Sequence, residues 1–129
     1  MVFRILADLL LVFHLLFILF VLFGGIFVFY RLQMVLLHLP AVCWGIYIEL
    51  SGNICPLTPL ENHLRRMSGE AGYTSGFVDH FLMPILYPAG LTEEIQLLLA
   101  VCVLAVNMFA YFFVVRRYWR QRIAGRAEE

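Results

Sequence analysis

Long apolar runs separated by short polar stretches dominate the chain. Residues 5–30 contain two strongly polar side chains, Asp8 and His14, and are otherwise rich in Leu, Phe, Val and Ile. As a helix, this run would be about 39 Å long, which exceeds the roughly 30 Å hydrocarbon core of a bilayer. Residues 32–50 and 92–115 are two further apolar segments. The pattern therefore predicts three membrane-spanning helices.

Residues 51–91 have a different character and predict a loop with short helices. Thr58 and Glu61 have the spacing of a capping box, and Pro59 would occupy the first position of the helix. This short helix is expected to lie at the membrane interface. Residues 77–88 are apolar but too short to cross a bilayer, so we expect a half-helix or an interfacial helix there.

These segments predict an all-α fold, an integral membrane helical bundle of one domain, residues 1–129. It would have three full transmembrane helices and a short fourth helix that is partly inserted or interfacial; a distorted four-helix arrangement is the alternative. The composition agrees, with 63% hydrophobic and 14% charged residues and a mean hydropathy of +0.88. These values exclude a conventional soluble enzyme and a basic nucleic-acid binder. The first apolar run is too long for a signal peptide and is read as a retained span.

The basic residues suggest an orientation. All nine are Arg, and five of them lie within residues 116–126. Because positive charge faces the cytoplasm, the tail 116–129 is expected to be cytoplasmic. Three crossings would place Arg31 and the tail on the cytoplasmic side, which gives six Arg on that side and three on the outer side. Four crossings would give eight Arg on the cytoplasmic side and one on the outer side.

Ionisable side chains inside apolar segments are expected to face the protein interior, because a charge at the bilayer centre is costly. The short turn at Arg31 predicts that the first two spans pack as an antiparallel hairpin. His14 would then lie level with residues 47 and 48 and approach Glu49. Asp8 would lie level with the loop that contains Cys55.

Five side chains form the candidate polar core: Asp8, His14, His38, Glu49 and His80. The loop supplies a second candidate group: Cys55, Thr58, Glu61 and Arg65. Each residue also has a structural interpretation. A His can bond a backbone carbonyl in a packed bundle, and Asp8 can pair with Arg65 or Arg66. None of the three Cys residues forms a C-x-x-C pattern, which leaves a disulfide framework, a thiol-redox motif and covalent c-type haem unsupported.

Small and polar residues mark the expected packing faces. In the last span Gln96 and Asn107 are eleven positions apart and share a face with Ala100 and Ala110. Stripes of this kind are typical of helix packing in lipid. In the first span the adjacent pair Gly24 and Gly25 would let another backbone come close.

A set of residues through the middle of the chain gives a family resemblance. It runs His38-Leu39-Pro40, Trp44-Gly45, Glu49, Cys55-Pro56-Leu57-Thr58-x-Leu60-Glu61 and Leu64-Arg65, then Gly72-Tyr73, Phe77, His80 and Tyr87-Pro88, with Asp8, His14, Phe17 and Phe20 upstream. Over residues 4–115 the chain resembles the bacterial membrane-protein family called domain of unknown function 2784. The resemblance implies a small inner-membrane protein and supplies no activity.

The sequence leaves three functions open. The first is a non-enzymatic accessory or scaffold module, whose partners would be the lipid bilayer and a membrane protein or a second copy of the chain. The second is an intramembrane haem or transition-metal site, built from some of the imidazoles of His14, His38 and His80 together with the carboxylates of Glu49 and Asp8. The third is a small enzyme or transporter in which His, Glu and Asp side chains move protons. No phosphate-binding loop, nucleophile elbow or nucleic-acid patch is present.

Overall fold

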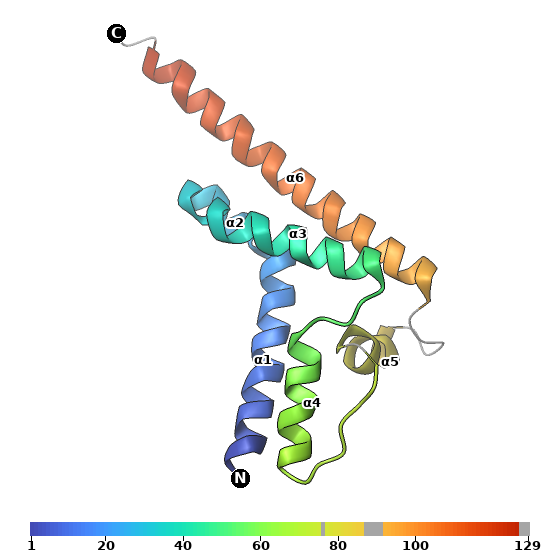
Figure 1. Ribbon diagram of the computed structural model, residues 1–129. Coiled ribbons are helices and arrows are strands. Elements are labelled where there is room, and N and C mark those ends of the chain that lie inside the picture. The colour runs from blue at the N-terminus through green and yellow to red at the C-terminus, as the bar shows by residue number, and fades with distance from the viewer. Residues whose placement is uncertain (76, 87–91, 127–129) are drawn as a thin grey trace.

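The computed structural model describes residues 1–75, 77–86 and 92–126, and every regular element within these ranges is helical. Along the chain the elements are α1 (Val2–Phe23), α2 (Gly25–Tyr30), a 3₁₀ turn (Leu32–Met34), α3 (Val35–Ser51), α4 (Leu57–Met67), a π-helical turn (Val78–Leu82), α5 (Met83–Leu86) and α6 (Glu93–Arg126). Their arrangement is shown in Figure 1. The all-α prediction is confirmed.

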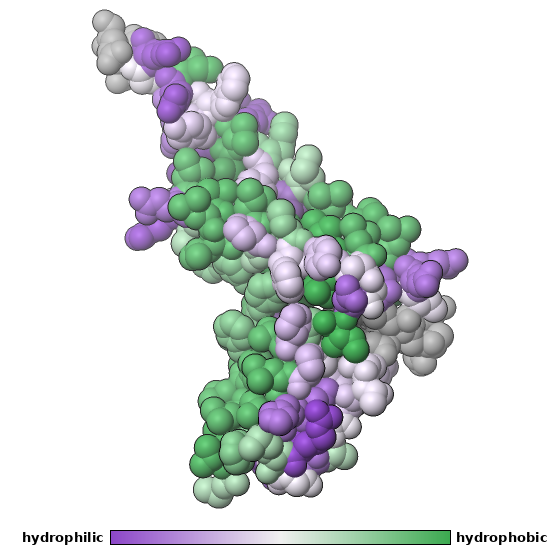
Figure 2. Space-filling model, in the orientation of Figure 1, coloured by the Kyte–Doolittle hydropathy of each residue, from purple (hydrophilic) through white to green (hydrophobic). Residues whose placement is uncertain are grey.

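Three helices are long and apolar enough to cross a membrane: Val2–Phe23, Leu32–Ser51 and Glu93–Arg126. Most of their large apolar side chains are exposed rather than packed inside the molecule. Figure 2 shows this hydrophobic surface over α1 and the middle of α6, whereas hydrophilic surface gathers beside α4 and toward the C-terminal end of α6. A protein with such a surface needs an apolar environment, so this is a membrane protein.

The first span differs from the expected continuous helix over residues 5–30. It is interrupted at Gly24, where the chain turns between α1 and α2. A side chain at Gly24 would collide with the His38 ring, and a Cβ at Gly25 would lie 2.7 Å from the Cβ of Ala110. The paired glycines therefore allow α2 to approach α3 and α6 closely, as the sequence predicts.

The expected hairpin of the first two spans is only partly formed. α3 crosses the C-terminal end of α1 instead of running along it (Figure 1), with Gly45 against Val21 at the crossing. The N-terminal half of α1 packs against α4, and α3 packs against α6. The cause is the turn at Gly24 and the extra helical turn of α2, which redirect the chain before α3 begins.

The predicted capping box of α4 is wrong. The helix begins at Leu57 behind Pro56, and no side chain caps its N-terminus. Thr58 and Glu61 are instead fully buried. The Glu61 carboxylate is engaged by other partners, described below, so it is not available to reach back to the start of the helix.

The ends of α3 and α6 follow local signals more closely. α3 ends at Ser51, and Gly52 adopts the left-handed conformation with φ of 63°. Thr92 caps α6, because its Oγ1 accepts a hydrogen bond of 3.3 Å from the Ile95 N–H. α6 does not stop at residue 115 but continues as one helix through Arg126. Of the expected interfacial segment 77–88, residues 87 and 88 lie outside the described ranges.

Candidate functional site

A pocket of about 230 Å³ lies where α1, α3 and the start of α6 meet. Most of its wall is apolar, and its polar side chains come from three different helices and from the loop after α3. The lining residues are His14, Phe17 and Ile18 of α1, Trp44, Gly45, Ile48 and Glu49 of α3, the loop residues Gly52, Asn53, Ile54 and Cys55, Phe77, and Gln96 of α6. Two members of the predicted polar core, His14 and Glu49, therefore share one cavity.

His14 is the most buried polar group of this pocket. Its side chain is only 4% exposed, and its ring lies against the ring of Phe77 with centroids 4.3 Å apart. Its Nδ1 atom has no hydrogen-bond partner among the described residues. Buried polar atoms without partners are uncommon in folded proteins and call for an explanation.

Glu49 stands on the opposite helix near the end of α3. It is half-buried, and no salt bridge reaches it among the described residues. Gln96 lies across the pocket, with its Oε1 close to the backbone of Gly52. The pocket therefore presents an imidazole, a carboxylate and an amide within an otherwise apolar wall.

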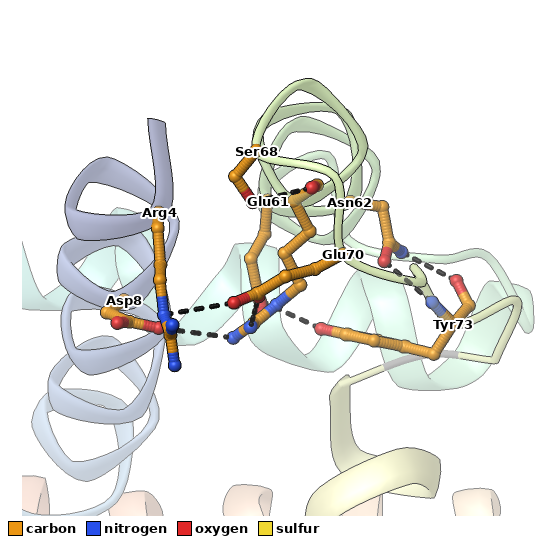
Figure 3. Close-up of polar contacts among 8 residues, drawn as sticks. Arg4, Asp8, Glu61, Asn62, Ser68, Glu70 and Tyr73 are labelled. Atoms are coloured by element: carbon orange, nitrogen blue, oxygen red, sulfur yellow. Dashed lines mark hydrogen bonds and ion pairs between the residues drawn. The ribbon is translucent and has the colours of Figure 1, made fainter. Parts of the chain in front are cut away.

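A second polar assembly surrounds Arg65 and joins α4 to α1. Figure 3 shows its members Arg4, Asp8 and Glu70 between the two helices. The Arg65 guanidinium lies 2.9 Å from Glu61 Oε1, 3.1 Å from Glu70 Oε2 and 3.6 Å from Asp8 Oδ1. Arg4 of α1 closes the assembly through an ion pair of 2.9 Å to Glu70. Of the two partners that the sequence offers for Asp8, Arg65 and Arg66, the structure pairs it with Arg65.

The buried Glu61 carboxylate is fully used in this assembly. Its Oε1 accepts from Arg65, and its Oε2 accepts a hydrogen bond of 2.8 Å from the Tyr73 hydroxyl. Asn62, the next residue on α4, exchanges two hydrogen bonds with the Tyr73 backbone, at 2.7 and 2.8 Å. Side chains of α4 thus bond both the backbone and the side chain of Tyr73, which holds the loop after α4 against the helix.

The same contacts shift two pKa values. Burial would lower the pKa of Arg65, but the hydrogen bonds to Glu61 and Glu70 and the negative charges of Glu61 and Asp8 outweigh it and raise that pKa. Burial and the hydrogen bond to Glu61 raise the pKa of the Tyr73 phenol far above its ordinary range. Arg65 therefore remains charged and Tyr73 remains a hydrogen-bond donor at physiological pH.

The other two predicted imidazoles lie elsewhere. His38 is fully buried at the contact of α3 with α6, where its Nδ1 shares a hydrogen bond of 3.0 Å with the Tyr111 hydroxyl. His80 is exposed and stacks on the Tyr73 ring at 4.1 Å. The five side chains of the predicted polar core therefore divide among separate places.

The three imidazoles considered for a metal or haem site lie apart from one another. His14, His38 and His80 have different neighbours, and no group of three His, Cys, Asp or Glu side chains in the described part of the chain comes together as metal ligands. Cys55 has a free thiol at the wall of the pocket. Thr58 is buried with its hydroxyl unpaired among the described residues.

Sequence reasoning missed several members of the Arg65 assembly. The Glu61–Arg65 pair has the i,i+4 spacing that stabilises helices, which is a readable signal. No such signal marked Glu70, Tyr73 and Asn62. Glu70 and Tyr73 lie in the loop after α4 and reach the helix only because this loop folds back onto it. The sequence analysis counted Arg4 only as one of the three arginines expected on the outer side of the membrane.

Comparison with known proteins gives a family and no named relative. No curated protein and no solved structure matches this chain. The sequence model of the family described as "Protein of Unknown function (DUF2784)" matches residues 4–112, which include nearly all of α1, the elements from α2 to α5 and more than half of α6. The chain belongs to this family.

Proposed function

We propose that this protein is a non-enzymatic accessory or scaffold module of the bacterial inner membrane, with its basic C-terminus in the cytoplasm. The observation that carries the proposal is the closed assembly around Arg65. Residue types that could perform acid–base chemistry there are instead occupied in holding α4 and the following loop against α1.

The burial of Glu61 supports a structural role for this assembly. A general acid or base must reach the proton that it transfers, directly or through one water molecule. Glu61 is 0% exposed, and both of its oxygens already accept hydrogen bonds from the protein. Arg65 likewise contacts three carboxylates at once. Such groups fix the position of α4.

The surface of the molecule supports a partner within the membrane. α1, α3 and α6 expose most of their apolar side chains, and α6 extends beyond its contacts with the other helices as a long basic helix. A membrane protein, either a different chain or a second copy of this one, is the partner that such faces fit.

The proposal is tested by native electrophoresis of the protein after mild-detergent extraction from the membranes of the producing bacterium. We expect an assembly larger than the 14.9 kDa chain. Glu61→Gln should reduce the assembled fraction in step with its loss of thermal stability. Glu93→Gln, which alters an exposed carboxylate, is the matched control.

Two results would contradict the scaffold role. One is migration of the native protein as a monomer under every mild extraction. The other is a Glu61→Gln variant that keeps its melting temperature and its assembly but no longer restores the phenotype of cells that lack the protein. That outcome would require a chemical role for the carboxylate.

A further inference from the structure

We propose that the pocket between α1, α3 and α6 binds a lipophilic amine, a molecule with an apolar chain and a protonated amino head group. The inference goes beyond the proposed function, because a scaffold needs no small ligand. It rests on the position of the pocket, on its unpaired polar atoms and on the sign of its charge.

The pocket lies at one end of two apolar helices. Glu49 is two residues before the end of α3, and Gln96 is in the first turn of α6. If these helices cross a bilayer, their ends lie near its boundary with water. A cavity at this level suits an amphiphile whose head group is polar and whose chain extends into lipid.

The charge of the lining favours a cation. No Arg contributes to the wall, and Glu49 has no ion-pair partner among the described residues. The C-terminal end of α3, with its unsatisfied carbonyls, adds negative potential beside Glu49. The N-terminal end of α6 would oppose this, but Glu93 and Glu94 occupy its first turn.

His14 supplies the second independent observation. It is more than nine-tenths buried, lines the pocket, and leaves Nδ1 without a partner among the described residues. In the tautomer with the proton on Nε2, Nδ1 is an acceptor. An ammonium group carries three donors and no acceptor, so a wall that holds a carboxylate, an amide oxygen and an imidazole matches it in kind.

The size of the pocket limits what enters it. At about 230 Å³ it is smaller than the roughly 300–1,000 Å³ of cavities that enclose drug-sized ligands. It therefore holds the head group and the adjoining carbons, and the remainder of the chain lies along the exposed apolar faces of the helices. Trp44 in the wall is placed to report on such a ligand.

The test uses Trp44 as a reporter in the full-length protein in phosphatidylcholine nanodiscs. The Trp119→Phe variant leaves Trp44 as the sole tryptophan, and the reciprocal Trp44→Phe variant leaves Trp119, which is outside the pocket and corrects for partitioning into lipid. The probe is stearylamine with a quenching nitroxide near its head. Stearyl alcohol and stearic acid with the same label are the head-group controls.

We expect saturable quenching of Trp44 by the amine, with a dissociation constant about tenfold lower than that for the alcohol or the acid. Glu49→Gln should weaken binding of the amine about tenfold and leave binding of the alcohol nearly unchanged. Arg66→Gln, which alters an exposed charge outside the pocket, should change neither. Unlabelled stearylamine should compete with the probe.

Linear quenching that is equal for the three head groups, or an amine affinity that Glu49→Gln leaves unchanged, would overturn the inference. If Glu49→Gln fails to fold, as judged by circular dichroism, the head-group comparison on the Trp119→Phe protein decides alone. Native assembly is measured without any ligand, so failure of this inference and failure of the scaffold role are distinguishable.

Discussion

At the scale of single residues, Arg65 holds the most consequential position in the assembly that joins α4 to α1. It is the cation that faces the fully buried Glu61 carboxylate. Arg65→Gln would leave that carboxylate buried without its counter-charge, which costs roughly 3 kcal/mol of unfolding free energy. Thermal unfolding in a mild detergent, followed by circular dichroism, measures the loss.

The neighbouring Arg66 provides the matched control, because it is exposed and forms no ion pair among the described residues. Arg66→Gln should change stability by less than about 0.5 kcal/mol. Adding Glu61→Gln to Arg65→Gln removes the orphan charge and should recover part of the loss. Equal destabilisation by the Arg65 and Arg66 variants would show that the buried pair is not what holds α4.

Tyr73 gives a prediction that depends on pH. Its pKa is raised by burial and by the hydrogen bond to Glu61, so the folded protein favours the neutral phenol. A raised pKa means that the stabilisation is complete below the unfolded-state value of about 10 and is lost as the pH rises through the folded-state value. Tyr73→Phe removes this contribution, which is about 2 kcal/mol for a bond to a carboxylate.

The measurement compares the unfolding free energies of the native protein and Tyr73→Phe at about pH 8 and about pH 11. The difference between the two proteins should shrink at the higher pH, while the remaining tyrosines cancel in the comparison. A difference that stays constant across this range would mean that the hydroxyl makes no ionisation-sensitive contact in the fold.

At the scale of helices, the paired glycines set how closely α2 approaches its neighbours. A Cβ added at Gly25 would lie 2.7 Å from the Cβ of Ala110 on α6, so one helix must move. We expect Gly25→Ala to cost about 1–3 kcal/mol through overpacking. Adding Ala110→Gly returns the space and should recover most of the loss, which a double-mutant cycle of unfolding free energies measures.

Gly125 of α6 is the control for the effect of glycine itself. A Cβ there would meet nothing within 4 Å. Gly125→Ala should therefore stabilise α6 slightly, by about 0.5–1 kcal/mol at most, because alanine favours a helix. If Gly25→Ala proves as harmless as Gly125→Ala, the close approach of α2 to α6 is not a stabilising contact.

The helices were predictable to the extent that local sequence governs them. Unbroken apolar runs identified the three long helices, and the expected start of the last one at residue 92 agrees with the cap formed by Thr92. The capping box at Thr58 failed because tertiary partners outcompete a local bond: Glu61 gains Arg65 and Tyr73. Turns such as that at Gly24 follow from contacts with distant helices, which local periodicity does not encode.

At the scale of the whole molecule, the site was predictable only in part. The short connection between the first two spans was sufficient to predict that His14 and Glu49 approach each other, although α3 crosses α1 instead of running antiparallel along it. It was insufficient to place His38, which depends on where α6 crosses α3, or His80, which follows the loop after α4. The five side chains of the predicted polar core are therefore divided. His14 and Glu49 line the open pocket, Asp8 and His80 contact the closed ionic assembly around Arg65, and His38 lies apart from both.

The number of long helices makes a prediction about topology. Three crossings place the two ends of the chain on opposite sides of the membrane, and the five Arg in residues 116–126 favour the cytoplasm for the C-terminal end. α4 then lies on the outer side of the membrane.

After replacement of Cys43, Cys55 and Cys102 by Ser, a cysteine at exposed His63 should react with a membrane-impermeant maleimide in intact cells, whereas Gly125→Cys should react only after permeabilisation. The reverse pattern would invert the orientation, and labelling of both sites from the same side would require an even number of crossings, with the segment before α6 passing through the bilayer. Because arginine-based orientation depends on charge and not on packing, replacing the tail Arg residues by Gln should weaken the preference in the same assay while leaving the helical content unchanged.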